Sequence, residues 1–251
     1  MRGSPEIDRS GARPIDDRAA LLPPRSAALL QGLEQRIVSC RRCPRLVEWR
    51  ERVAREKRAA FRDEEYWGRP VPGFGDPEAP VYALGLAPAA HGANRTGRIF
   101  TGDRSGDWLF SAMKRTGFSN LSHPRHRDDG LRLTGVWIGA AVRCAPPANK
   151  PLPQERANCL PFAREELALL RPVVLLCLGS LAWDSALALL PERPRPKPRF
   201  GHGAELVPPG GGPVLLGSFH PSQQNTFTGK LTEEMTDSVL LRARELAGLQ
   251  Q

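Results

Sequence analysis

The sequence predicts an α/β protein with a parallel sheet that is covered by helices on both faces. Four apolar runs have the length and composition of strands buried on both sides, at residues 81–86, 136–142, 173–178 and 214–219. Helical patterns separate most of these runs and follow the last one, at residues 108–116, 162–170, 181–190 and 232–246. Strands that alternate with helices in this way are typical of parallel sheets.

The length of 251 residues suits one domain with a sizeable core, and we expect residues 26–251 to form it. Residues 1–25 mix Arg, Asp, Pro, Ser and Gly with little apolar periodicity, which predicts a disordered tail. A helical pattern then leads to Cys40, and Pro44 suits the first turn of a second helix. A short run at 204–207 has the composition of a hairpin partner for the last strand.

The net charge of +9 favours an anionic partner, and nucleic acid is the leading candidate because basic side chains displace counterions from phosphates. A solvated arginine-rich surface explains the same charge equally well. No apolar run is long enough to span a bilayer, and the N-terminus lacks the apolar core of a signal peptide. We therefore expect a cytoplasmic, monomeric protein with no membrane partner.

Five cysteines in such a compartment indicate thiols or metal ligands rather than disulfides. Cys40 and Cys43 form a C-x2-C pair, and Cys144 and Cys159 form a second pair. Cys177 lies in an apolar run and is expected to be a buried small hydrophobe. Four thiolates suit either a structural zinc ion or a [4Fe-4S] cluster, and the spacing does not decide between them.

A long glycine-rich segment, residues 85–107, joins the first apolar run to the next helical pattern. Connections of this length usually have a function. Its glycines allow the backbone to approach a ligand, Phe100 offers an aromatic face and Asp103 offers a carboxylate. Because the carboxyl ends of parallel strands meet at one edge of the sheet, we expect Asp103, Asn149 and His220 to converge on one crevice there.

Each of these three residues also has a purely structural interpretation. Asp103 precedes a helical pattern and could serve only as its N-cap, a role that Ser105 or Asp107 could also fill. Asn149 follows two prolines as a turn residue would, and His220 could be a hydrogen-bonded core histidine.

Three stretches of the sequence stand out, and each follows an apolar run or overlaps its end. They are Gly-Leu-Ala-Pro-Ala-Ala-His-Gly-Ala-Asn-Arg-Thr-Gly-Arg-Ile-Phe-Thr-Gly-Asp at 85–103, Ala-Val-Arg-Cys-Ala-Pro-Pro-Ala-Asn-Lys at 141–150 and His-Pro-Ser-Gln-Gln-Asn-Thr-Phe-Thr-Gly-Lys-Leu-Thr at 220–232. These stretches resemble the signature stretches of the type B (family 5) uracil-DNA glycosylases. The resemblance implies a three-layer α/β/α sandwich on a four-stranded parallel sheet. It also implies hydrolysis of the bond between uracil and deoxyribose in DNA, which leaves an abasic site. The two cysteine pairs fall where that family places its iron–sulfur ligands, so the resemblance favours the cluster over zinc.

The resemblance also implies roles for individual residues. Asp103 would orient or deprotonate the attacking water and stabilise the positive sugar, and His220 would stabilise the departing base. The backbone amides of Gly85 and Leu86 would assist His220, Phe100 would stack on the base, and Asn149 would read its edge. Other classes of the superfamily carry a polar or acidic residue where this chain has Ala87. A less polar pocket suits wider acceptance, so hypoxanthine is an expected second substrate.

Polar residues of the same segments are expected to contact DNA phosphates from one rim of the crevice. They are Arg95, Arg98, Arg104, Gln223, Gln224 and Lys230. The loop 223–229 is expected to wedge into the duplex as the base leaves it. A metal-stapled nucleic-acid-binding protein without activity would explain the charge and the cysteines, but not the carboxylate in the glycine-rich loop. A nucleotide-binding α/β enzyme is disfavoured because neither a Walker pattern nor G-x-G-x-x-G is present.

Overall fold

Four parallel strands form the centre of the sheet, as the apolar runs predict. The computed structural model describes residues 24–250. The central strands are β2 (Val81–Gly85), β3 (Val136–Ala140), β4 (Val174–Leu178) and β6 (Val214–Ser218). Within the described residues the sheet has six strands in the order β1-β3-β2-β4-β6-β5, because a short antiparallel strand is added at each edge.

The edge strands β1 (Phe74–Gly75) and β5 (Glu205–Leu206) have two residues each. β5 pairs with β6, which confirms the predicted hairpin partner, whereas β1 was not predicted. The central position of β2 is explained by its sequence, because all five of its residues are buried and apolar or small. Val81 pairs with Val136 on one side and Val174 on the other, so both edges of the strand are hydrogen-bonded.

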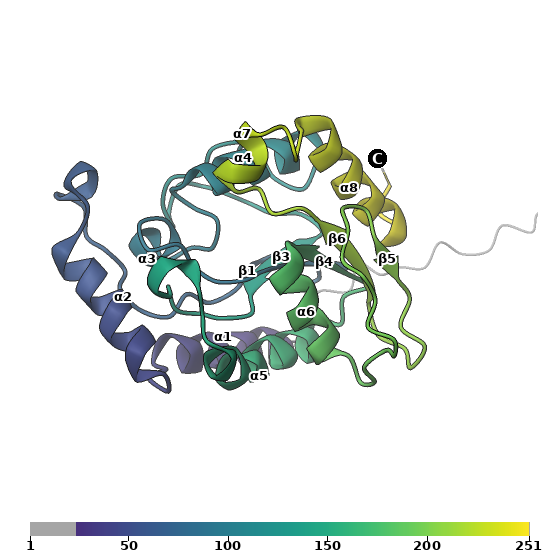
Figure 1. Cartoon of the computed structure of the whole chain (residues 1–251), viewed down its shortest axis with the longest axis horizontal. Coiled ribbons are helices and arrows are strands. Elements are labelled where there is room, and N and C mark those ends of the chain that lie inside the picture. The colour runs from purple at the N-terminus through teal and green to yellow at the C-terminus, as the bar shows by residue number, and fades with distance from the viewer. Residues whose placement is uncertain (1–23, 251) are drawn as a thin grey trace, which may run out of the picture.

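Helices cover both faces of the sheet and confirm the three-layer arrangement (Figure 1). One face packs against α4 (Arg104–Arg115) and α8 (Glu233–Leu246). The other face packs against α5 (Pro153–Leu170) and α6 (Ser180–Leu189), and α1 (Pro24–Val38) lies against α5. Successive residues of β2 alternate between the two cores, since Ala83 belongs to the first and Tyr82 to the second.

Several helices differ from the sequence-based expectation. Pro44 begins α2 (Pro44–Glu56), as expected. The helix predicted at 162–170 is only the second half of α5. Pro161 lies inside this helix, whereas in a sequence a proline at that position indicates that a helix begins there. The short helices α3 (Ala93–Thr96) and α7 (Gln223–Phe227) were not predicted, nor were the 3₁₀ turns η1 (Ala59–Phe61) and η2 (Pro147–Asn149).

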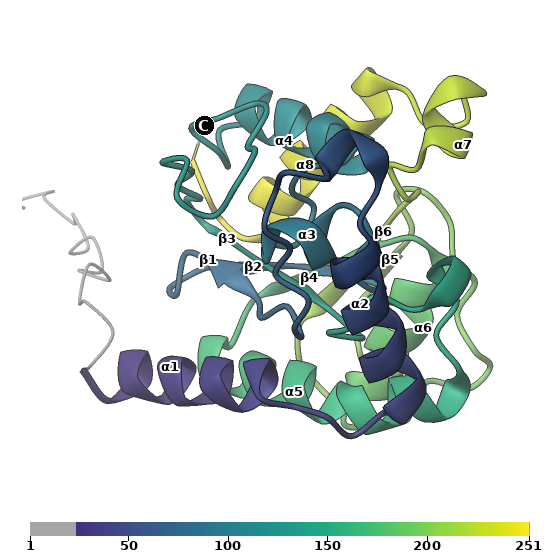
Figure 2. The ribbon, with the colours of Figure 1, turned by 90° about the vertical axis from the view of Figure 1, so that its left-hand side faces the viewer.

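The carboxyl ends of the central strands point toward α3, and α2 lies beside α3 (Figure 2). Residues 67 and 68 are hydrogen-bonded to α3, because their backbone amides donate to the carbonyls of Arg95 and Asn94. The predicted tail, residues 1–25, lies outside the described residues except for its last two, which belong to the first turn of α1. None of the described helices is long and apolar enough to cross a membrane.

Candidate active site

The loops that follow β2, β4 and β6 meet at one point beyond the sheet. Phe100 and His220 lie together there, with ring centroids 5.9 Å apart and ring planes inclined by 37°. Phe100 also covers Gly85, where a Cβ would lie 3.1 Å from its ring. His220 packs against Gly179, the N-cap residue of α6, which has a φ of +101°. The structure therefore brings together Gly85, Phe100 and His220, three of the predicted site residues.

Asp103 caps the helix α4, as its structural interpretation predicted. Its backbone is extended, and Oδ1 accepts a hydrogen bond of 2.9 Å from the amide of Gly106. The other side of the carboxylate lies against Gly92, where a Cβ would be 2.9 Å from Cγ and closer still to Oδ2. One oxygen thus serves the cap while the other faces the backbone of the same loop, so capping does not exclude a chemical role.

Burial raises the pKa of the Asp103 carboxyl. The amides of Gly106 and Ser105 oppose this rise, the nearby Asp107 adds to it, and the charge of Arg95 lowers the pKa. A carboxylate held in this balance accepts a proton more readily than an exposed one, which suits a general base.

The backbone around Phe100 explains why the chain turns so sharply before α4. Phe100 has a φ of +54°, which is unusual for a bulky residue and marks a locally strained conformation. A Cβ at Gly106 would lie 2.6 Å from the carbonyl carbon of Phe100, so only glycine fits at that position. Phe100 and Gly106 together fix the turn in which Asp103 lies.

His220 follows β6 and leads into α7. Its backbone carbonyl accepts hydrogen bonds from the amide of Ser222 at 2.8 Å and from Nδ2 of Asn225 at 2.9 Å. Burial lowers the pKa of the His220 imidazole to about 4. At neutral pH the ring is therefore uncharged and offers one N–H donor.

Leu86 lies just beyond β2, and its carbonyl accepts from the amide of Val142, which extends the pairing with β3 past the strand end. Asn149 lies in the exposed turn η2, with a φ of +57°, and no hydrogen bond or ring contact among the described residues joins it to Phe100 or His220. Its side-chain amide makes no hydrogen bond to any other residue that the structure describes.

Arg95 and Arg98 lie inside the protein rather than on the rim where they were expected. Arg95 is 8% exposed and pairs with Glu64, while Arg98 is 7% exposed and pairs with Asp129 at 2.6 Å. With their guanidinium groups bonded internally, we no longer count them among the candidate phosphate contacts.

The remaining candidate DNA contacts are exposed and lie around α7, where a loop was expected. Gln223 and Gln224 begin this helix, and the guanidinium of Arg104 lies 5.3 Å from the ring centre of Phe227. Lys230 lies over the ring of Phe219 at 5.1 Å. Phe227 is 69% exposed, and sequence reasoning did not single it out. Its signal was an aromatic residue within a polar segment.

The four paired cysteines line one small cavity, next to Val142 and Phe162. Three of their sulfur atoms face N–H groups. Nη1 of Arg50 donates to Cys144 at 2.9 Å, the amide of Arg143 donates to Cys159 at 3.2 Å, and Nδ2 of Asn158 lies 3.7 Å from Cys43. Cys177 is fully buried in β4, as predicted.

Two almost fully buried arginines line this region, and parts of their guanidinium groups lack partners. Nε of Arg50 and both Nε and Nη1 of Arg143 make no hydrogen bond among the described residues. Glu166 pairs with Arg143 at 2.5 Å and also accepts from Tyr82. Buried cations and sulfur-directed N–H groups fit an anionic thiolate-bound group. Within residues 24–250, however, no three His, Cys, Asp or Glu side chains are arranged to hold one metal ion.

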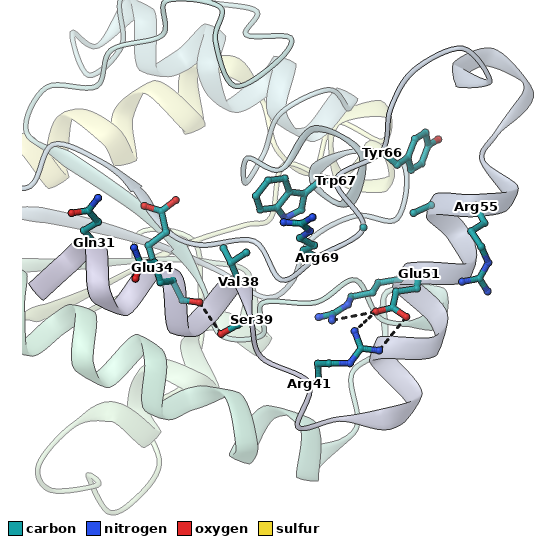
Figure 3. A pocket seen from close by; sticks show the side chains of 14 residues that line it. Gln31, Glu34, Val38, Ser39, Arg41, Glu51, Arg55, Tyr66, Trp67 and Arg69 are labelled. Atoms are coloured by element: carbon teal, nitrogen blue, oxygen red, sulfur yellow. Dashed lines mark hydrogen bonds and ion pairs between the residues drawn. The ribbon is translucent and has the colours of Figure 1, made fainter. Parts of the chain in front are cut away.

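A groove of about 870 Å³ lies between α1, α2 and residues 66–69, and contains none of the predicted site residues (Figure 3). Its charged lining includes Arg55, Arg69 and an Arg41–Glu51 ion pair. The hydroxyl of Tyr66, which lines the groove, is 3.1 Å from Nδ1 of His91 in the loop that carries Asp103. We place the candidate active site at the strand ends, because the loops found there carry the Asp103 carboxylate, the imidazole of His220 and the ring of Phe100.

The fold and the site together define an α/β protein whose candidate site lies beyond the carboxyl ends of a parallel sheet. The family described as the uracil DNA glycosylase superfamily matches residues 72–244, and the chain belongs to this superfamily.

Named relatives match most of the chain. A Type-5 uracil-DNA glycosylase of Thermus thermophilus is 53% identical over 220 residues, which cover 87% of this chain and 99% of the relative. A protein of the same name from Mycobacterium tuberculosis is 53% identical over 213 residues, covering 84% and 79% of the two chains. The one from Mycobacterium leprae is 49% identical over 227 residues, covering 89% and 98%.

Proposed function

We propose that the protein removes uracil from DNA by hydrolysing its N-glycosidic bond, which leaves an abasic site. The observation that carries this proposal is the placement of the Asp103 carboxylate by the cap of α4, in the loop that also brings Phe100 against His220. Membership of the superfamily and the names of the relatives support it.

In this mechanism Asp103 orients the attacking water and accepts its proton. The same negative charge stabilises the oxocarbenium-like sugar as the bond to the base breaks. Phe100 stacks on the extruded base, which must leave the helix before it can reach the site. His220 donates its N–H to the departing uracil anion, together with the backbone amides of Gly85 and Leu86.

Base choice is assigned to Asn149 and to the space beside Ala87. The free amide of Asn149 can accept from N3 of uracil and donate to O4. Its exposed position in η2 leaves the amide accessible to an extruded base. The small side chain of Ala87 is consistent with a pocket that also admits hypoxanthine.

DNA contact is assigned to the surface around α7. Arg104 and Lys230 provide positive charge, and Gln223 and Gln224 provide further phosphate donors. Phe227 is the aromatic side chain placed to enter the duplex when the base leaves it, because it projects from this helix and is mostly exposed.

We further propose that Cys40, Cys43, Cys144 and Cys159 hold a [4Fe-4S] cluster, with zinc as the alternative. When bound, the cluster would link α1, α2 and α5 as a structural cross-link. A cluster takes one thiolate on each of four irons, whereas zinc draws four sulfur atoms to about 2.3 Å from one ion. The four cysteines line one cavity, and the N–H groups directed at three of the sulfur atoms would offset the negative charge of a thiolate-bound group. Anaerobically purified protein should contain iron and acid-labile sulfide, and zinc without sulfide would contradict the cluster.

The function is tested with a duplex oligonucleotide that contains one uracil. Incubation followed by alkali should cut the strand at that position, because only a glycosylase leaves an alkali-labile site. Asp103→Asn should bind the same duplex but lose about 10²-fold or more in single-turnover rate. Asn caps a helix as well as Asp, so the variant separates capping from chemistry. A protein that binds DNA and leaves no alkali-labile site would be the non-enzymatic alternative.

A further inference from the structure

Arg95 connects the two backbone segments that enclose the Asp103 carboxylate. Its Nε donates to the carbonyl of His91 at 2.9 Å, and its Nη2 donates to the carbonyl of Gly102 at 2.8 Å. Gly102 is the residue before Asp103, and His91 is the residue before Gly92, whose backbone touches the carboxylate. The guanidinium of Arg95 is therefore hydrogen-bonded to both backbone segments that lie beside the Asp103 carboxylate.

The guanidinium is itself held on its remaining sides. Nη1 pairs with Glu64, and the ring of Phe61 lies 3.9 Å from Cζ. Gly102 has a φ of +82°, and a Cβ there would lie 3.3 Å from Cζ of Arg95. The contact with the backbone therefore depends on glycine at 102 and on the rigid fork of arginine, which a lysine cannot reproduce.

We propose that Arg95 is a positioning residue for catalysis, which fixes Asp103 by tying Gly102 to His91. The proposal rests on the proposed function, since it gives Asp103 the catalytic role. It replaces the expected contact between Arg95 and DNA, and it assigns the effect of Arg95 to the rate of base release rather than to DNA affinity.

The charge of Arg95 gives a second, independent signature. Burial raises the pKa of Asp103, the amides of Gly106 and Ser105 lower it, Asp107 raises it and Arg95 lowers it. Asp107 is 3.5 Å from Arg125, which partly neutralises its charge, and Nδ1 of His123 lies 3.9 Å from the same carboxylate. Removing the charge at Arg95 should let Asp103 bind a proton at higher pH, which moves the acid limb of the pH–rate profile upward.

The test compares Arg95→Gln, Arg95→Lys and wild type on a uracil duplex. Single-turnover rates at saturating enzyme should fall about 10- to 100-fold in both variants, because a displacement of about 1 Å costs up to about 10²-fold. DNA affinity should stay within about 3-fold of wild type, since Arg95 is buried. The acid limb should move to higher pH in Arg95→Gln and stay in place in Arg95→Lys, which keeps the charge.

Arg98→Gln is the matched control. It removes an equally buried arginine from the same loop and breaks its ion pair, and Arg98 bonds to Thr101, Arg127 and Asp129 rather than to Gly102. Its acid limb should coincide with that of wild type. An equal shift in this control would mean that general loosening of the loop explains the effect. Weaker DNA binding by Arg95→Gln with an unchanged saturating rate would mean that Arg95 contacts DNA. Either result would overturn the proposal.

Two further measurements cover failure of folding and failure of the proposed function. If the Arg95 variants do not fold, Glu64→Gln provides the alternative test, because the Glu64 side chain is half-exposed. This substitution removes the ion pair with Nη1 of Arg95, and the single-turnover rate should fall about 3- to 10-fold. An unchanged rate would contradict the proposal. If wild type releases no uracil, the proposed function fails. Carbon-detected NMR titration of Asp103 still tests the contact, because its pKa should rise in Arg95→Gln whether or not the protein is active.

Discussion

Substituting Gly92 by alanine tests whether the position of the Asp103 carboxylate sets the rate. Gly92 has a φ of −99° and a ψ of −104°, and its Cα faces the carboxylate directly. A Cβ there would be 2.9 Å from Cγ of Asp103 and closer to Oδ2, whereas carbon atoms pack best at about 3.5–4.0 Å. The carboxylate must therefore move by about 1 Å, which corresponds to about a 10²-fold loss in rate.

Single-turnover cleavage of a uracil duplex measures this loss, and thermal unfolding measures the accompanying strain. Overpacking of this kind costs about 1–3 kcal/mol, so the variant should remain folded at 25 °C. Gly32→Ala is the control, because a Cβ at that position in α1 meets no atom within 4 Å apart from its chain neighbours and the nearby backbone of its own helix. It should keep the wild-type rate and gain about 0.5–1 kcal/mol from helix propensity.

The double variant Gly92→Ala with Asp103→Asn tests whether the substitution at Gly92 lowers the rate by displacing Asp103. If Gly92→Ala acts through Asp103, adding it to Asp103→Asn should lower the rate little further, because the two residues act as one unit. Losses that multiply, or a Gly92→Ala rate within about 3-fold of wild type, would refute the reasoning.

Four further predictions follow from the site and its surface. The pKa of His220 is about 4 in the folded protein and about 6.5 when unfolded, so the unfolded chain binds more protons between these values. Stability should fall by up to about 3 kcal/mol as the pH drops from 6.5 to 4, and urea titrations should show a smaller fall in His220→Gln. Asn149→Asp should remove uracil more slowly than wild type does, and its rate on hypoxanthine should fall by a smaller factor. Equal fractional losses of the single-turnover rate on both bases would mean that Asn149 only supports the turn. Arg104→Gln and Lys230→Gln should each reduce the salt dependence of DNA affinity by about 0.9 in log–log slope, and an unchanged slope would place DNA elsewhere. Phe227→Ala should slow release of paired uracil more than release from single strands, as measured by rapid quenching, because only a duplex needs a wedge.

The sequence predicted the central sheet well because its signals are local. Each central strand lies within an uninterrupted apolar run, and the cap at Asp103 follows from one carboxylate placed just before a helical pattern. The short helix α7 could not be predicted in the same way, since five residues are too few to form a helix without tertiary contacts.

The direction of the arginine side chains could not be predicted either. Arg95 and Arg98 occur in a polar, glycine-rich segment that resembles a phosphate-binding rim in sequence. The carboxylates that hold them inside, Glu64 and Asp129, each lie 31 residues away in the chain. Burial of a charged residue depends on such distant partners, which local patterns do not reveal.

The two edge strands have a consequence for association between copies of the chain. β1 and β5 expose only two residues each at the margins of the sheet, and prolines stand on either side of β1 and directly after Val207 beyond β5. Long, flat edges invite pairing with a neighbouring chain, while short edges flanked by proline discourage it. The short edge strands therefore disfavour pairing of the apolar central sheet with the sheet of another copy.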